Sequence, residues 1–144
     1  MPKRNRSPPP RPDLNLGVKP HADASMVTFL LQDKEVEGLQ ILKDGQWFRV
    51  PIVPNAILIN AGDQAEIMSN GMFKSPVHRV VTNSDRERLT VVVFCLPNSK
   101  MEIGPVEKII NEKRPRLYKR IKNYGAICYE NYQLGKRQID AVKI

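Results

Sequence analysis

The amino-acid sequence predicts a mainly β fold, an antiparallel sandwich or barrel, followed by helices at the C-terminal end. Three observations support this prediction. Between Leu14 and Leu96 the apolar residues come in short runs separated by turn residues, as is typical of antiparallel β proteins. One of these turns contains Asp44-Gly45, the strongest local signal for a tight hairpin. After Pro97 the apolar residues recur instead at helical spacing.

Six short runs rich in Val, Ile, Leu and Phe are expected to form the strands. They are residues 26–32, 38–42, 46–51, 56–60, 77–83 and 88–96. The segment 83–87 ("NSDRE") is a second hairpin candidate. Between the runs 56–60 and 77–83, "GDQAEIMSN" predicts a short helix, with Asp63 near its start and Gly71 after its end.

The C-terminal part is expected to be helical. Residues 104–112 predict a short helix with Pro105 in its first turn. Residues 115–135 predict a longer helix that ends at Gly135. We therefore divide the chain into a Pro-rich basic tail (1–13) that is expected to be disordered, a β core (14–97) and a C-terminal helical extension (98–144).

Composition narrows the possible function classes. The net charge of +8 is unevenly distributed: residues 1–20 carry +4, residues 97–144 carry +6 and residues 21–96 carry −2. The terminal charges lack the interleaved aromatics of a nucleic-acid surface, so we expect no nucleic-acid partner. No apolar run approaches the ~18 residues that span a bilayer, and no secretory signal follows the basic start. Two cysteines suit a reducing compartment, so a cytoplasmic location is expected.

The stretch "VKPHADAS" (18–25) places a histidine and an aspartate two positions apart. If the segment is extended, His21 and Asp23 point to the same face and converge on one point. Such a pair can hold a metal, form a hydrogen bond or have no function. Taken alone, the pair is more often structural.

A third candidate ligand changes this balance. His78 lies 55 positions after Asp23 in another predicted strand, and the chain has only two histidines. Two His and one Asp, two of them adjacent and one distant, match the facial triad of non-haem iron(II) oxygenases. Three protein ligands on one face leave coordination positions open for a co-substrate and dioxygen, whereas a structural site would be closed.

Such an oxygenase commonly draws electrons from a 2-oxo acid, whose far carboxylate needs a cationic partner. Arg88 and Thr90 follow His78 by ten and twelve residues and share a face if the segment is a strand. Arginine offers a two-pronged donor that matches a carboxylate, and threonine adds a hydroxyl. Arg86 competes for this role but lies in the predicted turn, so it ranks lower. A surface charge is the alternative interpretation of Arg88.

The motifs that carry these candidate ligands, together with their neighbours, resemble those of a known family. The series "LGVKPHADAS", "GLQILKDGQWFRVP", "INAGDQAEIMSNGMFKSPVHRVV" and "RLTVVVF" is similar to the C-terminal half of plant 2-oxoglutarate- and iron(II)-dependent oxygenases. The resemblance runs from about Arg11 to the C-terminus. It is strongest to the branch of senescence-related oxygenases, codeine and other alkaloid O-demethylases, and norcoclaurine-synthase-like proteins.

The resemblance implies a double-stranded β-helix (jelly roll, cupin-like) over residues 14–97, with iron(II) on His21, Asp23 and His78. It implies 2-oxoglutarate on Arg88 and Thr90, where the family usually has Ser instead of this Thr. Dioxygen is the second co-substrate and ascorbate a supporting reductant. The implied reaction hydroxylates or O-demethylates a small phenolic or alkaloid metabolite while 2-oxoglutarate is decarboxylated to succinate. Phe29, Leu31 and Phe94 are candidate pocket walls, with ordinary core positions as the alternative.

Two departures from the family keep alternatives open. Relatives are longer, with an N-terminal helical domain, and they have a Tyr-containing strand where this chain has "RNRSPPPRPD". We therefore expect a jelly roll truncated at its N-terminus, with an unpaired sheet edge and an exposed apolar sheet face. The expected protein is a monomer, prone to aggregation if truncated. The alternatives are a catalytically impaired or inactive remnant and a non-catalytic cupin-like metal-binding module.

Overall fold

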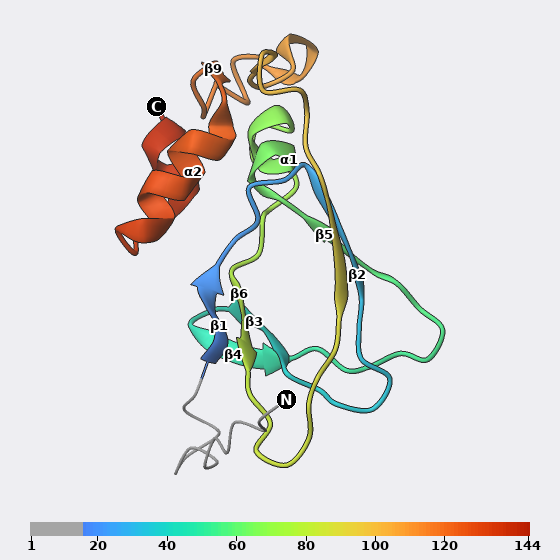
Figure 1. The fold of residues 1–144 in the computed structure, drawn as a ribbon. Coiled ribbons are helices and arrows are strands. Elements are labelled where there is room, and N and C mark those ends of the chain that lie inside the picture. The colour runs from blue at the N-terminus through green and yellow to red at the C-terminus, as the bar shows by residue number, and fades with distance from the viewer. Residues whose placement is uncertain (1–15) are drawn as a thin grey trace.

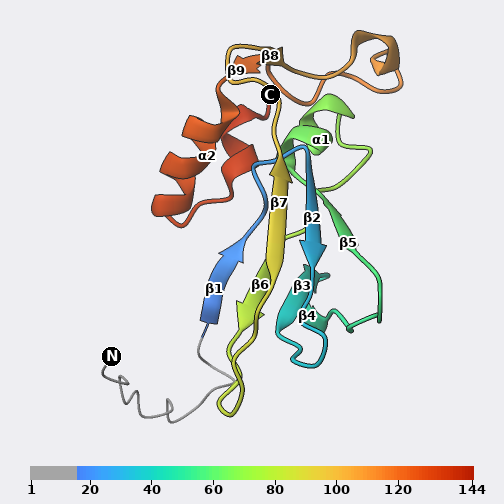
Figure 2. The same ribbon diagram turned by 45° about the vertical axis from the view of Figure 1, so that its right-hand side comes forward.

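The computed structural model describes residues 16–144, so the predicted tail over 1–13 lies outside the described residues. Two antiparallel sheets face each other, and the C-terminal segment packs at one end of them around a short helix (Figure 1). Figure 2 shows that this segment lies beside β1 (Leu16–His21) and α1 (Asp63–Met68) and away from the loops at the opposite end of the sheets. Among the described residues, no helix is long and apolar enough to cross a membrane.

Consecutive strands alternate between the two sheets, with one hairpin as the exception. Sheet A has the order β1 (Leu16–His21), β6 (His78–Val81), β3 (Leu39–Lys43), β4 (Gln46–Arg49). Sheet B has the order β5 (Leu58–Ala61), β2 (Val27–Leu31), β7 (Val91–Cys95). This arrangement of antiparallel strands is that of a jelly roll, and it confirms the mainly β prediction.

The β3–β4 hairpin forms where the sequence predicts it. Asp44 and Gly45 both adopt positive φ, +50° and +76°, as a two-residue turn between twisted strands requires. The second predicted hairpin, at 83–87, is wrong. Its flanking strands β6 and β7 belong to different sheets, so the segment is a crossover loop. The polar residues do form a local turn, because Asn83 Oδ1 accepts hydrogen bonds from the backbone N–H groups of Asp85 and Arg86. Such a turn does not indicate which strands pair.

Helix α1 (Asp63–Met68) also forms as predicted, and Gly71 follows it with a φ of +82°. Its start packs tightly on the segment after β1. A Cβ on Gly62 would lie 2.0 Å from the carbonyl oxygen of Ser25, so only glycine fits there. This close approach positions α1 against Ser25, two residues after the candidate metal ligand Asp23.

The C-terminal helices are shorter than predicted. In place of the helix at 104–112 there is one 3₁₀ turn, η2 (Glu107–Ile109), preceded by β8 (Glu102–Ile103). The helix predicted at 115–135 is limited to α2 (Tyr124–Gln133), and it is preceded by β9 (Ile121–Lys122), which pairs with β8. Long-range contacts override the helical periodicity, because the buried Tyr118 is held by Glu66. A final 3₁₀ turn, η3 (Gln138–Val142), ends the described fold.

The main buried apolar cluster lies between α1 and the C-terminal segment. Its members are Ile67, Ile103, Tyr118, Tyr124, Cys128, Ile139 and Val142. Six of these seven side chains come from residues beyond 97, so the C-terminal segment supplies most of this core. The three-part division of the chain stays a prediction.

The outer face of sheet B is apolar and exposed. Phe29 lies directly opposite Ile59 on one neighbouring strand and Val93 on the other. These three side chains are 38%, 65% and 54% exposed. The outer face of sheet A is polar instead, since Arg79 there donates to Gln40 and stacks over Trp47. The two sheets therefore differ in what their outer faces can pack against.

Candidate metal and co-substrate site

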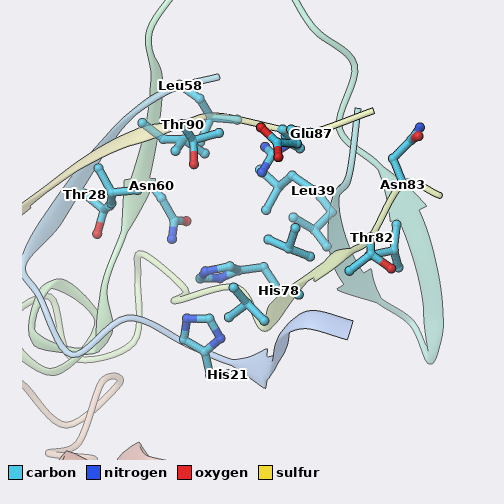
Figure 3. A pocket seen from close by; sticks show the side chains of 18 of the residues that line it. His21, Thr28, Leu39, Leu58, Asn60, His78, Thr82, Asn83, Glu87 and Thr90 are labelled. Atoms are coloured by element: carbon cyan, nitrogen blue, oxygen red, sulfur yellow. The ribbon is translucent and has the colours of Figure 1, made fainter. Parts of the chain in front are cut away.

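A cavity of about 980 Å³ lies between the two sheets, and the predicted metal ligands and 2-oxoglutarate-binding residues all line it. Its lining includes His21, Asp23, His78, Arg88 and Thr90. In Figure 3 the rings of His21 and His78 lie next to each other at one end, with Thr28 and Asn60 opposite them and Thr90 farther along. The rest of the lining divides between the polar segment 82–87 and aliphatic residues such as Leu30, Leu39, Ile41, Leu58 and Val92.

Three potential metal ligands converge at one end of this cavity. Nε2 of His21 and Nε2 of His78 lie 3.6 Å and 3.5 Å from the same oxygen, Oδ1 of Asp23. The three ligand atoms lie within 4.8 Å of one another. Within residues 16–144, this is the one group of three or more His, Cys, Asp or Glu side chains with that geometry. The antiparallel pairing of β1 and β6 puts His21 opposite His78 and so brings the distant ligand to the adjacent pair.

Backbone carbonyls orient both imidazoles. Nδ1 of His21 is 2.8 Å from the Lys19 carbonyl oxygen, and Nδ1 of His78 is 3.2 Å from that of Pro76. A carbonyl only accepts, so each Nδ1 carries the proton and each Nε2 keeps its lone pair for a metal. Burial lowers the pKa of His21 below its ordinary value of 6.5, which favours the neutral ring that a metal needs.

Asp23 is 4% exposed, and its two oxygens have different surroundings. Oδ2 accepts from the Thr28 hydroxyl and from the Asn60 amide, each at 2.8 Å. Oδ1 faces the two Nε2 atoms instead. Thr28 and Asn60 are register partners on β2 and β5. Sheet B therefore supplies the groups that orient the Asp23 carboxylate, which lies on the segment that follows β1. A carboxylate held at one oxygen and open at the other suits a monodentate metal ligand.

These donors fit iron(II). Two neutral imidazoles and one carboxylate oxygen on a single face match the two-His, one-carboxylate ligand set of non-haem iron. The empty space of the cavity adjoins the same face, so coordination positions remain for smaller ligands. The donor set contains no cysteine, which argues against a closed thiolate zinc site.

Arg88 has the features of a carboxylate partner. Its Nε donates to the Val36 carbonyl oxygen at 3.2 Å, while its Nη2 is buried without a hydrogen-bond partner among the described residues. Desolvation lowers the pKa of this guanidinium, although nearby Asp33 opposes the effect. A buried cationic donor without a partner is costly, and a ligand carboxylate in the cavity would satisfy it. The structure therefore fits a dicarboxylic co-substrate at this position.

The segment that carries Arg88 is held by a turn on the facing loop. Asp33 accepts backbone N–H groups from Leu89, Glu35 and Val36, each at 2.9 Å. These bonds, the one from Leu89 first, lower the pKa of Asp33 to about 2. Thr90 lines the same cavity beyond Leu89. Strand β7 starts only at Val91, so Arg88 and Thr90 lie just before the strand and not within it as predicted.

The remaining predicted residues divide between the cavity and the surface. Arg86 also lines the cavity, but it forms an ion pair with Glu35 and both side chains are more than half exposed, so the competing clamp already has a partner. Phe94 lines the cavity as predicted. Phe29 and Leu31 do not line it, because they alternate with Thr28 and Leu30 and point to the outer face of sheet B. Phe29, Leu31 and Phe94 are all exposed, so none of them is a buried core residue.

Several supporting residues could not be identified from the sequence pattern. Thr28 and Asn60 look like ordinary polar residues in predicted strands, and only the β2–β5 register brings them to Asp23. Gly38 is another example. A Cβ there would lie 2.8 Å from the Val81 carbonyl oxygen and 3.1 Å from Cδ of Arg88, so its small size makes room for the guanidinium stem.

Known proteins share these features. Residues 3–97 match the family model described as the 2OG-Fe(II) oxygenase superfamily. The chain is 47% identical to a flavonol synthase/flavanone 3-hydroxylase of Petunia hybrida, over 88% of this chain and 36% of that protein. It is 40% identical to thebaine 6-O-demethylase of Papaver somniferum, over 99% of this chain and 40% of that protein.

A solved structure agrees with these sequence matches. The crystal structure of JOX2 in complex with 2OG, Fe and JA superimposes with a TM-score of 0.80 at 35% identity. The match covers 94% of this chain and 41% of that one. This chain thus spans less than half the length of the relatives described here. Iron(II) and 2-oxoglutarate are the cofactor and co-substrate of the family, and the cavity fits both. The chain belongs to the 2OG-Fe(II) oxygenase superfamily.

Proposed function

We propose that this chain forms the catalytic core of an iron(II)- and 2-oxoglutarate-dependent oxygenase that acts on a small plant secondary metabolite. The observation that carries the proposal is the convergence of His21 Nε2 and His78 Nε2 on Asp23 Oδ1, in the same cavity as an unpartnered buried guanidinium nitrogen of Arg88. The proposed core is 14–97, and the segment 98–144 is the proposed C-terminal extension.

In this proposal His21, Asp23 and His78 hold the metal and Arg88 and Thr90 hold 2-oxoglutarate. Bound iron(II) supplies dioxygen activation coupled to decarboxylation of 2-oxoglutarate to succinate, with ascorbate as supporting reductant. The chain itself orients the reactants. The Lys19 and Pro76 carbonyls keep Nδ1 of each histidine protonated, and Thr28 and Asn60 fix the carboxylate. The aliphatic residues of the lining give the reacting groups a partly apolar surrounding.

The proposed substrate class is a phenolic or alkaloid molecule. The apolar part of the cavity lining includes Leu58, Val92 and Phe94, and it suits a flat apolar ring system. The names of two relatives point in the same direction, since one is a flavonol synthase/flavanone 3-hydroxylase and another a thebaine O-demethylase. Hydroxylation and O-demethylation remain alternative outcomes of one reaction type.

The test separates metal binding, co-substrate binding and turnover. The full chain is titrated anaerobically with iron(II) and 2-oxoglutarate, and the metal-to-2-oxoglutarate charge-transfer band is followed. We expect the band in the parent, its loss in His78→Ala and a large loss of 2-oxoglutarate affinity with retained metal binding in Arg88→Ala. Absence of the band in the folded parent would overturn the proposal. Succinate release with phenolic or alkaloid ethers then tests catalysis.

A catalytically impaired core is the second candidate, because the chain spans less than half the length of its relatives and leaves the outer face of sheet B exposed. In that case the charge-transfer band forms but no succinate is released. A cupin-like module without co-substrate chemistry is the third, and it predicts metal binding that is indifferent to Arg88→Ala. These outcomes are distinct in the same experiment.

We infer a monomer that aggregates when concentrated, located in the cytoplasm. Cys95 and Cys128 are both free, as suits a reducing compartment.

The open edge of sheet B is the expected cause of aggregation. In the described part of the chain β7 pairs only with β2, and its sequence VVVFC carries no charge to protect that edge. We expect Val93→Lys to reduce light scattering at high protein concentration. The matched change on the cavity-facing side, Val92→Lys, should not improve solubility; equal behaviour of the two variants would contradict the edge argument.

A further inference from the structure

Helix α2 reaches back from the C-terminal segment to the strand that ends in the first metal-ligand candidate. Tyr132, near the end of this helix, has its ring 5.9 Å from the ring of His21, measured between centroids. The two rings meet edge to face at 81°. Tyr132 is half-buried and does not line the cavity between the sheets, so it would not touch a bound substrate.

Lys19 connects the same helix to Nδ1 of His21. Its ammonium group donates to the Tyr132 carbonyl oxygen at 3.1 Å and lies 3.8 Å from the centroid of the Tyr132 ring. The carbonyl oxygen of the same lysine accepts from Nδ1 of His21 at 2.8 Å. One lysine thus bonds to helix α2 with its side chain and to the imidazole with its backbone.

These contacts restrict His21 in two ways. The hydrogen bond to the Lys19 carbonyl fixes the direction of the Nδ1–H bond, and the Tyr132 ring limits rotation of the imidazole from the side. His78 has a similar carbonyl bond, to Pro76, but no ring contact with α2 is among its interactions. The C-terminal helix therefore acts on one of the two histidines.

The geometry points to Tyr132, together with Lys19, as a positioning element through which the C-terminal helix sets the orientation of His21 as a metal ligand. This inference rests on the proposed function, because His21 matters as a ligand only if the site takes iron. It assigns a role in the metal site to a segment more than 100 residues away in the sequence.

The first test measures the metal alone. Co(II), which is stable in air, is titrated into the full chain and its d–d absorption is recorded. We expect Tyr132→Leu and Lys19→Met to weaken Co(II) binding by ~10-fold, the low end of the range for residues that support a metal ligand, and to change the band. Tyr132→Phe keeps the ring and should restore both. Tyr129→Leu is the matched control, since Tyr129 lies on the same helix and is 66% exposed.

The second test does not need a metal. The chain has only two histidines, so the ring signals of His21 and His78 can be followed separately by NMR in the metal-free protein. We expect Tyr132→Leu to shift the His21 signals more than those of His78, and Tyr129→Leu to leave both in place. If the parent fails to bind Co(II), the proposed function and the role of His21 as a ligand both fail, and the NMR comparison then shows separately whether Tyr132 orients the His21 ring.

The inference would be overturned in either of two ways. One is a Tyr132→Leu protein with the Co(II) affinity, absorption band and His21 signals of the parent. The other is a loss of affinity that Tyr132→Phe does not restore or that Tyr129→Leu reproduces, because the effect would then come from general damage to the helix.

Discussion

The amide of Asn60 donates a 2.8 Å hydrogen bond to Oδ2 of Asp23, 37 residues earlier in the chain. This bond joins strand β5 of sheet B to the segment after β1, which carries the candidate metal ligand Asp23. It occupies the oxygen of Asp23 that does not face the histidines, and so leaves Oδ1 for the metal. The first prediction concerns this relationship.

Asn60→Leu is expected to weaken iron(II) binding by ~10- to 100-fold, the range seen when a group that orients a metal ligand is removed. The physical reason is that Asp23 loses one of the two donors that fix its carboxylate. Isothermal titration with iron(II) under anaerobic conditions measures the change. Asn98→Leu is a suitable control, since Asn98 is exposed and does not line the cavity. Unchanged affinity in Asn60→Leu would show that Thr28 alone orients Asp23.

Gly38→Ala is expected to weaken 2-oxoglutarate binding much more than metal binding. The new Cβ would lie 3.1 Å from Cδ of Arg88 and 2.8 Å from the Val81 carbonyl oxygen, so the guanidinium stem must shift. The ratio of the two dissociation constants, from the same anaerobic titration, gives the result. Gly125→Ala is the comparison, because the nearest atom to its Cβ is 3.9 Å away. Equal losses of metal and 2-oxoglutarate affinity would instead indicate a disturbed sheet A.

The Asp33 turn is expected to lose its contribution to stability at low pH. Its pKa is lowered to about 2 in the folded chain, mainly by the N–H of Leu89. A group with a depressed folded pKa stabilises above its ordinary value of 3.8, and this stabilisation declines as the pH falls toward 2. The difference in denaturation midpoint between the parent and Asp33→Ala should therefore be constant above pH 5 and shrink below pH 4. A pH-independent effect of Asp33→Ala would refute this account.

Tyr118→Phe is expected to destabilise the fold by about 1.5–3 kcal/mol, the usual effect of losing a hydrogen bond to a charged group. The Tyr118 hydroxyl donates to Glu66 Oε1 at 2.8 Å, and both side chains are buried. Glu66 would keep its bond from the Ser75 N–H but lose its most buried partner. Urea unfolding followed by circular dichroism measures the loss. Tyr129→Phe, at an exposed position, should be neutral.

Much of the β core could be predicted from the sequence because its signals are local. Alternating apolar runs and the Asp44-Gly45 turn encode strands and one hairpin within a few residues. The spacing of His21 and Asp23 encodes a shared face in the same way. Arg88 could be predicted as a clamp only because the triad had already implied a carboxylate ligand.

The C-terminal segment shows where local signals fail. Leu117, Ile121 and Tyr124 recur at helical spacing, yet residues 115–123 are not helical. The Tyr118 hydroxyl donates a hydrogen bond to Glu66, and Ile121 pairs with Ile103 in a short sheet. These long-range contacts determine the local conformation despite the helical spacing of the apolar residues. The loop at 83–87 fails for the same reason, since its residues cannot indicate which sheet the next strand joins.

The sequence by itself determined which side chains are available for chemistry: two histidines, an aspartate beside one of them, and an arginine near the last strand. Tertiary structure alone decided how those groups are held. The strand registers bring His21 opposite His78 and set Thr28 and Asn60 on Asp23, while helix α2 places Tyr132 against His21. Ligand identity is a property of residue type, whereas orientation depends on hydrogen bonds and packing between segments far apart in the chain.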